Sequence, residues 1–132
     1  MRITADTNVL VRAVTGDDEQ QSKIAQAALA KADMVALALP ALCEFVWVLS
    51  QGYKTPSAKI AEAIRRLMNG ANVVVNRAAA EAGLALLDTG GDFADGIIAY
   101  EGSLLGAHTF VSFDKKAVKL VEAQGESVRL LT

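Results

Sequence analysis

Four acidic residues, far apart in the sequence, occupy positions where a carboxylate could do chemistry. They are Asp6, Glu44, Asp95 and Asp114. Carboxylates gathered in one crevice raise one another's pKa, and a hard divalent cation bound among them removes that repulsion. A site made only of oxygen ligands favours Mg²⁺ or Mn²⁺ over zinc or copper. Because such ions activate water and stabilise charge at a phosphate, the four acids predict hydrolysis of a phosphodiester bond.

Two of these acids, Asp6 and Asp114, each follow a short apolar run that can form a strand. The carboxyl ends of strands in a parallel sheet lie on one side, and ligands bind in the crevice there. We therefore expect the two side chains to face each other across that crevice. Each could instead only cap the helix that follows, since aspartate is a favoured N-cap residue.

Glu44 is the one charged residue in the apolar segment 41–49. A helix that is apolar on nearly all sides is buried, and burying an unpaired carboxylate is costly. The nearest basic residue in the sequence is Lys54. Glu44 must then pair with a residue from elsewhere in the fold, be protonated, or bind a metal ion; we favour a metal or active-site role. Because it follows the second predicted strand closely, it should return to the same edge of the sheet as Asp6.

Asp92 and Asp95 lie three residues apart at the start of a predicted helix, after the helix-breaking pair Gly90-Gly91. This spacing puts both side chains on one side of the first turn. We assign the helix cap, or a supporting role beside the metal ligands, to Asp92. We assign the chemistry to Asp95, which lies nearer the apolar Ile97 and Ile98.

The elements that must position these acids alternate along the chain. Short apolar runs predict strands at residues 2–5, 34–39, 72–75, 108–112 and 127–131. The segment that follows Asp6 has a helical pattern. Further helical patterns cover residues 17–31, 41–49, 56–68, 77–87, 94–105 and 115–123. In the segment 17–31, we expect Ile24 to face inward. This alternation predicts an α/β fold, a single domain over residues 1–132 with a central parallel sheet of four to five short strands buried on both faces.

Composition limits the classes of protein to which the chain can belong. One cysteine, Cys43, and one histidine, His108, exclude an internal disulfide and a zinc site built on such ligands. The longest apolar run, residues 34–43, is too short to span a membrane, so we expect a cytoplasmic protein without membrane contact. With 52% hydrophobic residues and a mean hydropathy of +0.30, the chain should bury a further face against a partner or a second copy. The net charge of −2 is unusual for a nucleic-acid binder, but cations held by four carboxylates would make the balance positive.

The acids and their neighbours together resemble a known family. The matching segments are Asp6-Thr7-Asn8, Glu44 within a long apolar helix, Asp95-Gly96-Ile97-Ile98-Ala99, and Ser112-Phe113-Asp114. In order and spacing they resemble the PIN domain, in particular the VapC-type toxins of bacterial toxin–antitoxin pairs. The resemblance implies a three-layer α/β/α fold, a Mg²⁺- or Mn²⁺-dependent endoribonuclease, a homodimer, and a protein antitoxin that blocks the site.

The resemblance also implies roles for single residues. The catalytic acids that bind the metal ions would be Asp6, Glu44, Asp95 and Asp114. Asn8 and Ser112 would steady them through hydrogen bonds, and Asp92 would be an accessory residue. Gly96 and Ser112 depart from the family, which more often has alanine and threonine at these positions.

Other side chains and other functions fit parts of the pattern. Candidate partner contacts are Trp47, Tyr53 and Phe45, and candidate phosphate contacts are Arg12, Lys54 and Lys115. Asp6 could be the nucleophile of an aspartyl phosphatase, but that chemistry needs a second acid two residues on, where this chain has Asn8. A module without catalysis could use the acids to hold a structural cation, to cap helices or to contact another protein.

Overall fold

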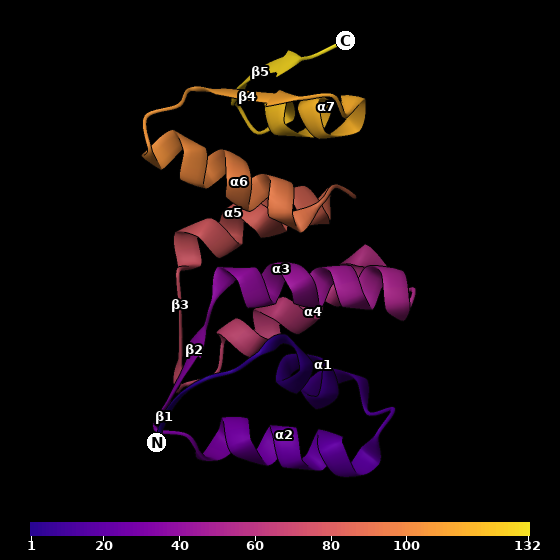
Figure 1. The fold of residues 1–132 in the computed structure, drawn as a ribbon, viewed down its shortest axis with the longest axis vertical. Helices are drawn as coiled ribbons and strands as arrows, with labels where there is room; N and C mark the ends of the chain where they lie inside the picture. Colours follow the sequence, from indigo (N-terminus) through magenta and orange to yellow (C-terminus); the bar gives the residue numbers. More distant parts are fainter. The chain divides into compact units, whose positions relative to one another are not determined.

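The computed structural model describes all 132 residues, which form two compact units, residues 1–76 and 77–132 (Figure 1). The chain contains seven α-helices, one short π-helix and five strands. Every pair of neighbouring strands is parallel. These observations confirm the predicted α/β class with short parallel strands. That all five strands join in one central sheet, and that the two units are a single domain, stays a prediction.

Residues 1–76 contain a three-stranded parallel sheet with the order β1-β2-β3. The strands are β1 (Arg2–Thr4), β2 (Met34–Leu37) and β3 (Val73–Val75). Val35 in the central strand pairs with Ile3 on one side and Val73 on the other. The connecting helices are α1 (Thr7–Thr15) and α2 (Glu19–Lys31) before β2, then α3 (Leu39–Trp47), the π-helix η1 (Val48–Gly52) and α4 (Ser57–Met68) before β3. Parallel neighbours require such crossover connections, which explains the alternation seen in the sequence.

The ends and faces of these helices follow from local sequence. Gly16 ends α1 with a φ of 70°, a left-handed conformation that glycine adopts without strain. Asp18 begins α2 and accepts a hydrogen bond from the backbone N–H of Gln21. α4 buries Ile60 and Ile64, four residues apart on one face.

Residues 77–132 begin with two helices, α5 (Arg77–Asp88) and α6 (Phe93–Leu104), which lie against each other. Strand β4 (Thr109–Ser112) pairs in parallel with β5 (Ser127–Leu130), with Phe110 opposite Val128. Helix α7 (Lys115–Ala123) connects the two strands and contacts both (Figure 1). α6 also contacts α7 and β4, so the four elements after α5 form one packed group.

Two predictions about burial are wrong. Ile24 on α2 is 61% exposed, because Ser22 and Ala25 form the buried face of that helix. The strands are not buried on both faces, since only β2 has buried residues while the other four alternate between exposed and half-buried. β2 is also the only strand with a neighbouring strand on each side.

The contact between α5 and α6 is close at two glycines. A Cβ atom at Gly96 would overlap the backbone oxygen of Ala82 in α5. A Cβ atom at Gly83 would lie 2.8 Å from the ring of Phe93, which is fully buried. Glycine at position 96 therefore lets the two backbones approach, and alanine, which the resemblance leads us to expect here, would not fit.

Replacing Gly96 by alanine should lower the free energy of unfolding by about 1–3 kcal/mol, the usual effect of over-packing an interior. Gly102→Ala is the matched control, because Gly102 lies in the same helix with no neighbouring atom within 4 Å of an added Cβ. The control should stabilise the protein by up to about 1 kcal/mol through helix propensity. Urea unfolding followed by circular dichroism measures both changes, and equal effects would contradict the close contact.

Candidate functional site

Asp6 and Asp114 both stand between a strand and a helix, as the sequence predicts. Asp6 follows β1, and its Oδ1 accepts a hydrogen bond of 3.0 Å from the backbone N–H of Val9 in α1. Asp114 follows β4, and its Oδ1 accepts one of 3.1 Å from the backbone N–H of Ala117 in α7. Both residues are therefore N-caps. Each cap uses one carboxylate oxygen, so the other remains available to a cation.

The family resemblance implies two neighbours that steady these acids, and one of them does so. Ser112 Oγ accepts a hydrogen bond of 3.0 Å from the backbone N–H of Asp114. This bond holds the turn from which the Asp114 side chain projects. The side chain of Asn8 is exposed and forms no hydrogen bond within the chain.

Asp92 and Asp95 lie at the first turn of α6 in different environments. Asp92 is the N-cap residue by backbone position, yet its exposed side chain accepts no capping hydrogen bond, so it is not a side-chain cap. Asp95 is half-buried. Burial, followed by the negative charges of Asp92 and Asp114, raises the pKa of Asp95 above its ordinary value of 3.8. Asp92 and Asp114 therefore both lie close enough to Asp95 for their charges to disfavour its ionised form.

Glu44 is exposed, which contradicts the buried position predicted from the sequence. Helix α3 buries Leu42, Phe45 and Val46. The apolar composition of this segment is a poor guide because only one face of the helix is covered. Glu44 forms no ion pair, so its charge is available to a ligand, although burial no longer requires one.

The donor set fits a hard divalent cation. None of the four acids forms an ion pair with lysine or arginine. Their oxygens are the ligands that Mg²⁺ and Mn²⁺ prefer, and a cation would relieve the repulsion at Asp95. No ready group of three or more His, Cys, Asp or Glu side chains is arranged to hold a metal ion. Asp6 and Glu44 belong to residues 1–76, and Asp95 and Asp114 to residues 77–132, so their assembly in one centre stays a prediction.

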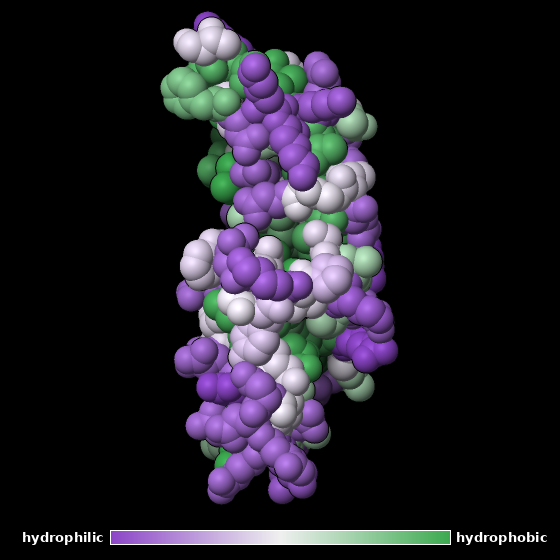
Figure 2. All heavy atoms as spheres, turned by 90° about the vertical axis from the view of Figure 1, so that its right-hand side faces the viewer, coloured by the Kyte–Doolittle hydropathy of each residue, from purple (hydrophilic) through white to green (hydrophobic).

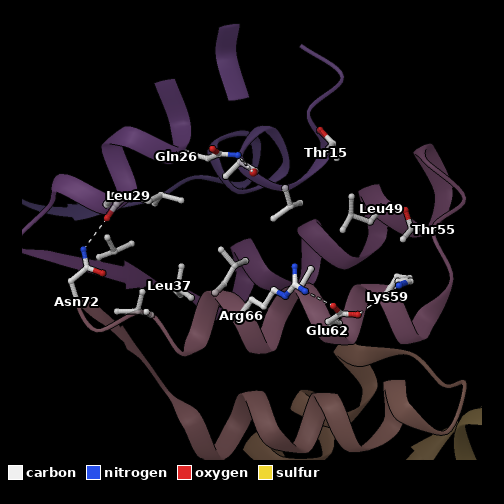
Figure 3. Close-up of a pocket in the computed structure, with 18 of the residues that line it drawn as sticks. Thr15, Gln26, Leu29, Leu37, Leu49, Thr55, Lys59, Glu62, Arg66 and Asn72 are labelled. Carbon is white, nitrogen blue, oxygen red and sulfur yellow. Dashed lines mark hydrogen bonds and ion pairs between the residues drawn. The ribbon is translucent and has the colours of Figure 1, made fainter. Parts of the chain in front are cut away.

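A large groove lies in residues 1–76 and contains none of the four acids. Its volume is about 920 Å³, and its walls are mainly apolar. Figure 3 shows Gln26 and Leu29 of α2 across from Lys59, Glu62 and Arg66 of α4. Glu62 pairs with Arg66 at 2.7 Å and with Lys59 at 3.9 Å. The spacing of Lys59, Glu62 and Arg66 in the sequence predicts one face of a helix. No sequence pattern predicts the groove itself, which depends on the distance between α2 and α4.

Apolar side chains reach the surface among polar ones in both units (Figure 2). Of the three aromatic residues named as candidate partner contacts, Trp47 is 67% exposed and Tyr53 is 38% exposed, whereas Phe45 is buried in the core and is not such a contact. The hydroxyl of Tyr53 donates a hydrogen bond of 2.7 Å to Asp17. No helix has the length and apolar character needed to cross a membrane. Part of the excess apolar composition is thus at the surface.

The comparison with protein families covers nearly the whole chain. The sequence pattern that defines the PIN domain matches residues 3–123, which include parts of both units and all four acids. PIN domains are generally nucleases, which are hydrolases that act on nucleic acid. The chain belongs to the PIN domain family. No curated protein matches the sequence.

The raised pKa of Asp95 predicts how stability depends on pH in the metal-free protein. A carboxyl group with a higher pKa in the folded state destabilises the fold above its unfolded pKa, because the folded state holds the proton more tightly. Asp95→Asn should therefore raise the free energy of unfolding in EDTA at about pH 7. The gain should shrink toward about pH 4, near the pKa of an unperturbed aspartate. Urea unfolding at the two pH values measures the change.

Glu126→Gln provides the control for the loss of one negative charge, because Glu126 is exposed and forms no ion pair. Its effect on the free energy of unfolding should be small at both pH values. A gain from Asp95→Asn that does not change with pH, or that Glu126→Gln reproduces, would contradict the electrostatic account.

Proposed function

We propose that this protein is a metal-dependent endoribonuclease that hydrolyses phosphodiester bonds of RNA. Membership of the PIN domain family supports the nuclease class, and the four acids stand at the positions that the resemblance assigns to the metal site. The observation that carries the proposal is the state of Asp95, which is half-buried, has no basic partner and feels the negative charges of Asp92 and Asp114. A carboxyl group with its pKa perturbed in this way is typical of a catalytic site.

Each acid has a local setting that suits a metal site. Asp6 and Asp114 are held by their cap hydrogen bonds at helix N-termini, where the helix dipole stabilises a negative charge. Their orientation is thus set before a ligand binds, and Ser112 holds the turn at Asp114. Asp95 would bind in its ionised form, which burial and the neighbouring acids disfavour in the metal-free fold. A bound Mg²⁺ or Mn²⁺ would activate water and stabilise charge on the phosphate.

As the toxin of a toxin–antitoxin pair, the protein would act as a homodimer in the cytoplasm. The resemblance to VapC-type toxins supports this role, as do the exposed apolar side chains. The groove between α2 and α4 is mainly apolar and has charged residues along one wall. Such a groove is the type of surface that receives an amphipathic helix, and a helix of the antitoxin is the proposed occupant.

A phosphatase with Asp6 as nucleophile is less well supported. That mechanism needs an acid two residues after the nucleophile, and Asn8 supplies none. The remaining alternative is a module that binds a cation without catalysis. The following experiment distinguishes such a module from a nuclease.

Cleavage should require both the metal and the acids. We expect the purified protein, freed of any antitoxin, to cut single-stranded or loop RNA in Mg²⁺ or Mn²⁺ and to lose this activity in EDTA. Loss of a residue that only supports a metal ligand typically reduces activity roughly 10- to 100-fold. Asp6→Asn and Asp95→Asn, which each remove a proposed ligand, should reduce the rate of cleavage by more than this. Asparagine can still cap α1, so the fold should survive the change at Asp6. Gel electrophoresis of end-labelled RNA measures cleavage, and calorimetric titration measures Mn²⁺ binding.

Asp33→Asn provides a matched control, because Asp33 is exposed and pairs with the N-terminal amine. This variant should bind Mn²⁺ and cut RNA as the wild type does. Cleavage that persists in EDTA, or metal binding unchanged in both site variants, would remove the proposed mechanism. Metal binding without cleavage of any RNA would favour the non-catalytic module.

A further inference from the structure

Helix α3 exposes one stripe of side chains, and this stripe carries both a predicted metal-binding acid and the only tryptophan of the chain. Pro40, Glu44 and Trp47 are exposed, at spacings of four and three residues that repeat on one face of a helix. Leu42 and Phe45 are buried on another face of the same helix. Trp47 is therefore not part of the core.

The exposure of Trp47 is unusual for its residue type. Its side chain is 67% exposed, whereas tryptophan is highly buried on average in folded proteins. The indole N–H forms no hydrogen bond within the chain. An exposed indole offers a broad apolar face, which is the type of surface on which nucleobases stack.

Trp47 lies one helical turn from Glu44. Side chains three residues apart in a helix have Cβ atoms about 5–6 Å apart. A phosphate bound to a metal ion that Glu44 holds would therefore bring an adjoining base within reach of the indole. We propose that Trp47 stacks on a base of single-stranded RNA beside the phosphate that is cleaved, an inference that rests on the proposed function. Because every base has a π-face, this contact would strengthen binding without selecting a sequence.

The surroundings of Trp47 favour RNA over a protein partner. Backbone hydrogen bonds from the residues on either side of Lys54 return to η1, which holds Lys54 beside the end of α3. Lys54 is exposed, forms no ion pair and has a φ of 54°, in the left-handed region that non-glycine residues rarely adopt. A cation without an ion pair, close in sequence to an exposed aromatic ring, suits the phosphate and the base of a single strand. The core of a protein–protein contact is instead poor in charged residues, whereas segment 44–54 carries two, Glu44 and Lys54.

The single tryptophan makes the test direct, because all indole fluorescence comes from Trp47. The full chain in Mg²⁺ is titrated with a short 2′-O-methyl phosphorothioate oligoribonucleotide of mixed sequence, which resists cleavage. We expect saturable quenching of tryptophan emission, in parallel with a rise in the anisotropy of a fluorescein-labelled copy. Trp47→Leu, which keeps an apolar side chain without a π-face, should weaken binding about fivefold or more. It should raise KM for RNA more than it lowers kcat, and Trp47→Phe should recover most of the affinity.

Ile24→Ala is the matched control, because Ile24 is also exposed, at 61%, and lies in the same unit outside the stripe. It should bind the oligonucleotide as the wild type does. Binding with unchanged tryptophan emission would overturn the stacking contact and leave the nuclease proposal intact. Weaker binding by Trp47→Leu that follows loss of a dimer in ultracentrifugation would also overturn it, and would assign Trp47 to an interface between copies. Failure of the wild type to bind or cut any RNA would instead overturn the proposed function, and this inference with it.

Discussion

The close contact between α5 and α6 is the constraint on which the acidic end of residues 77–132 depends. No side chain fits between the two backbones at Gly96, and Phe93 fills the space beside Gly83. The first turn of α6 therefore cannot shift without overlap with α5. Asp95 projects from this turn, where it is half-buried and its pKa is raised. α7, whose N-cap is Asp114, packs on the same helix, and the carboxylate of Asp114 adds to the negative charge that raises this pKa.

Local sequence patterns are sufficient where interactions over a few residues decide the structure. The five apolar runs are the five strands, and the helix predicted over residues 115–123 is α7 residue for residue. A short polar side chain before an apolar helical pattern predicts a cap, and Asp6 and Asp114 both cap helices. The two readings of these acids, cap and metal ligand, do not compete, because capping uses only one of the two oxygens.

Burial and long-range assembly lie beyond such patterns. The apolar segment around Glu44 predicts burial on all sides, but a sequence does not say how many faces of a helix other elements cover. The same reason explains why Ile24 is exposed and Phe45 is buried. The groove between α2 and α4 exists because two helices stay apart, which no periodicity encodes. The predicted assembly of all four acids likewise depends on segments far apart in the chain. The family match over residues 3–123 supports this assembly, whereas no local motif does.

The capping role of Asp6 and Asp114 bears on how relatives of this chain would diverge. Selection for folding alone would keep a capping residue at both positions, whether aspartate, asparagine, serine or threonine. Glu44 and Asp95 cap nothing, and Asp95 is electrostatically unfavourable in the empty fold. A lineage that had abandoned cleavage would therefore lose acids at positions 44 and 95 first while retaining those at 6 and 114. Among homologues, acids at positions 44 and 95 would therefore distinguish active nucleases from inactive proteins of the same fold more reliably than the aspartate at position 6.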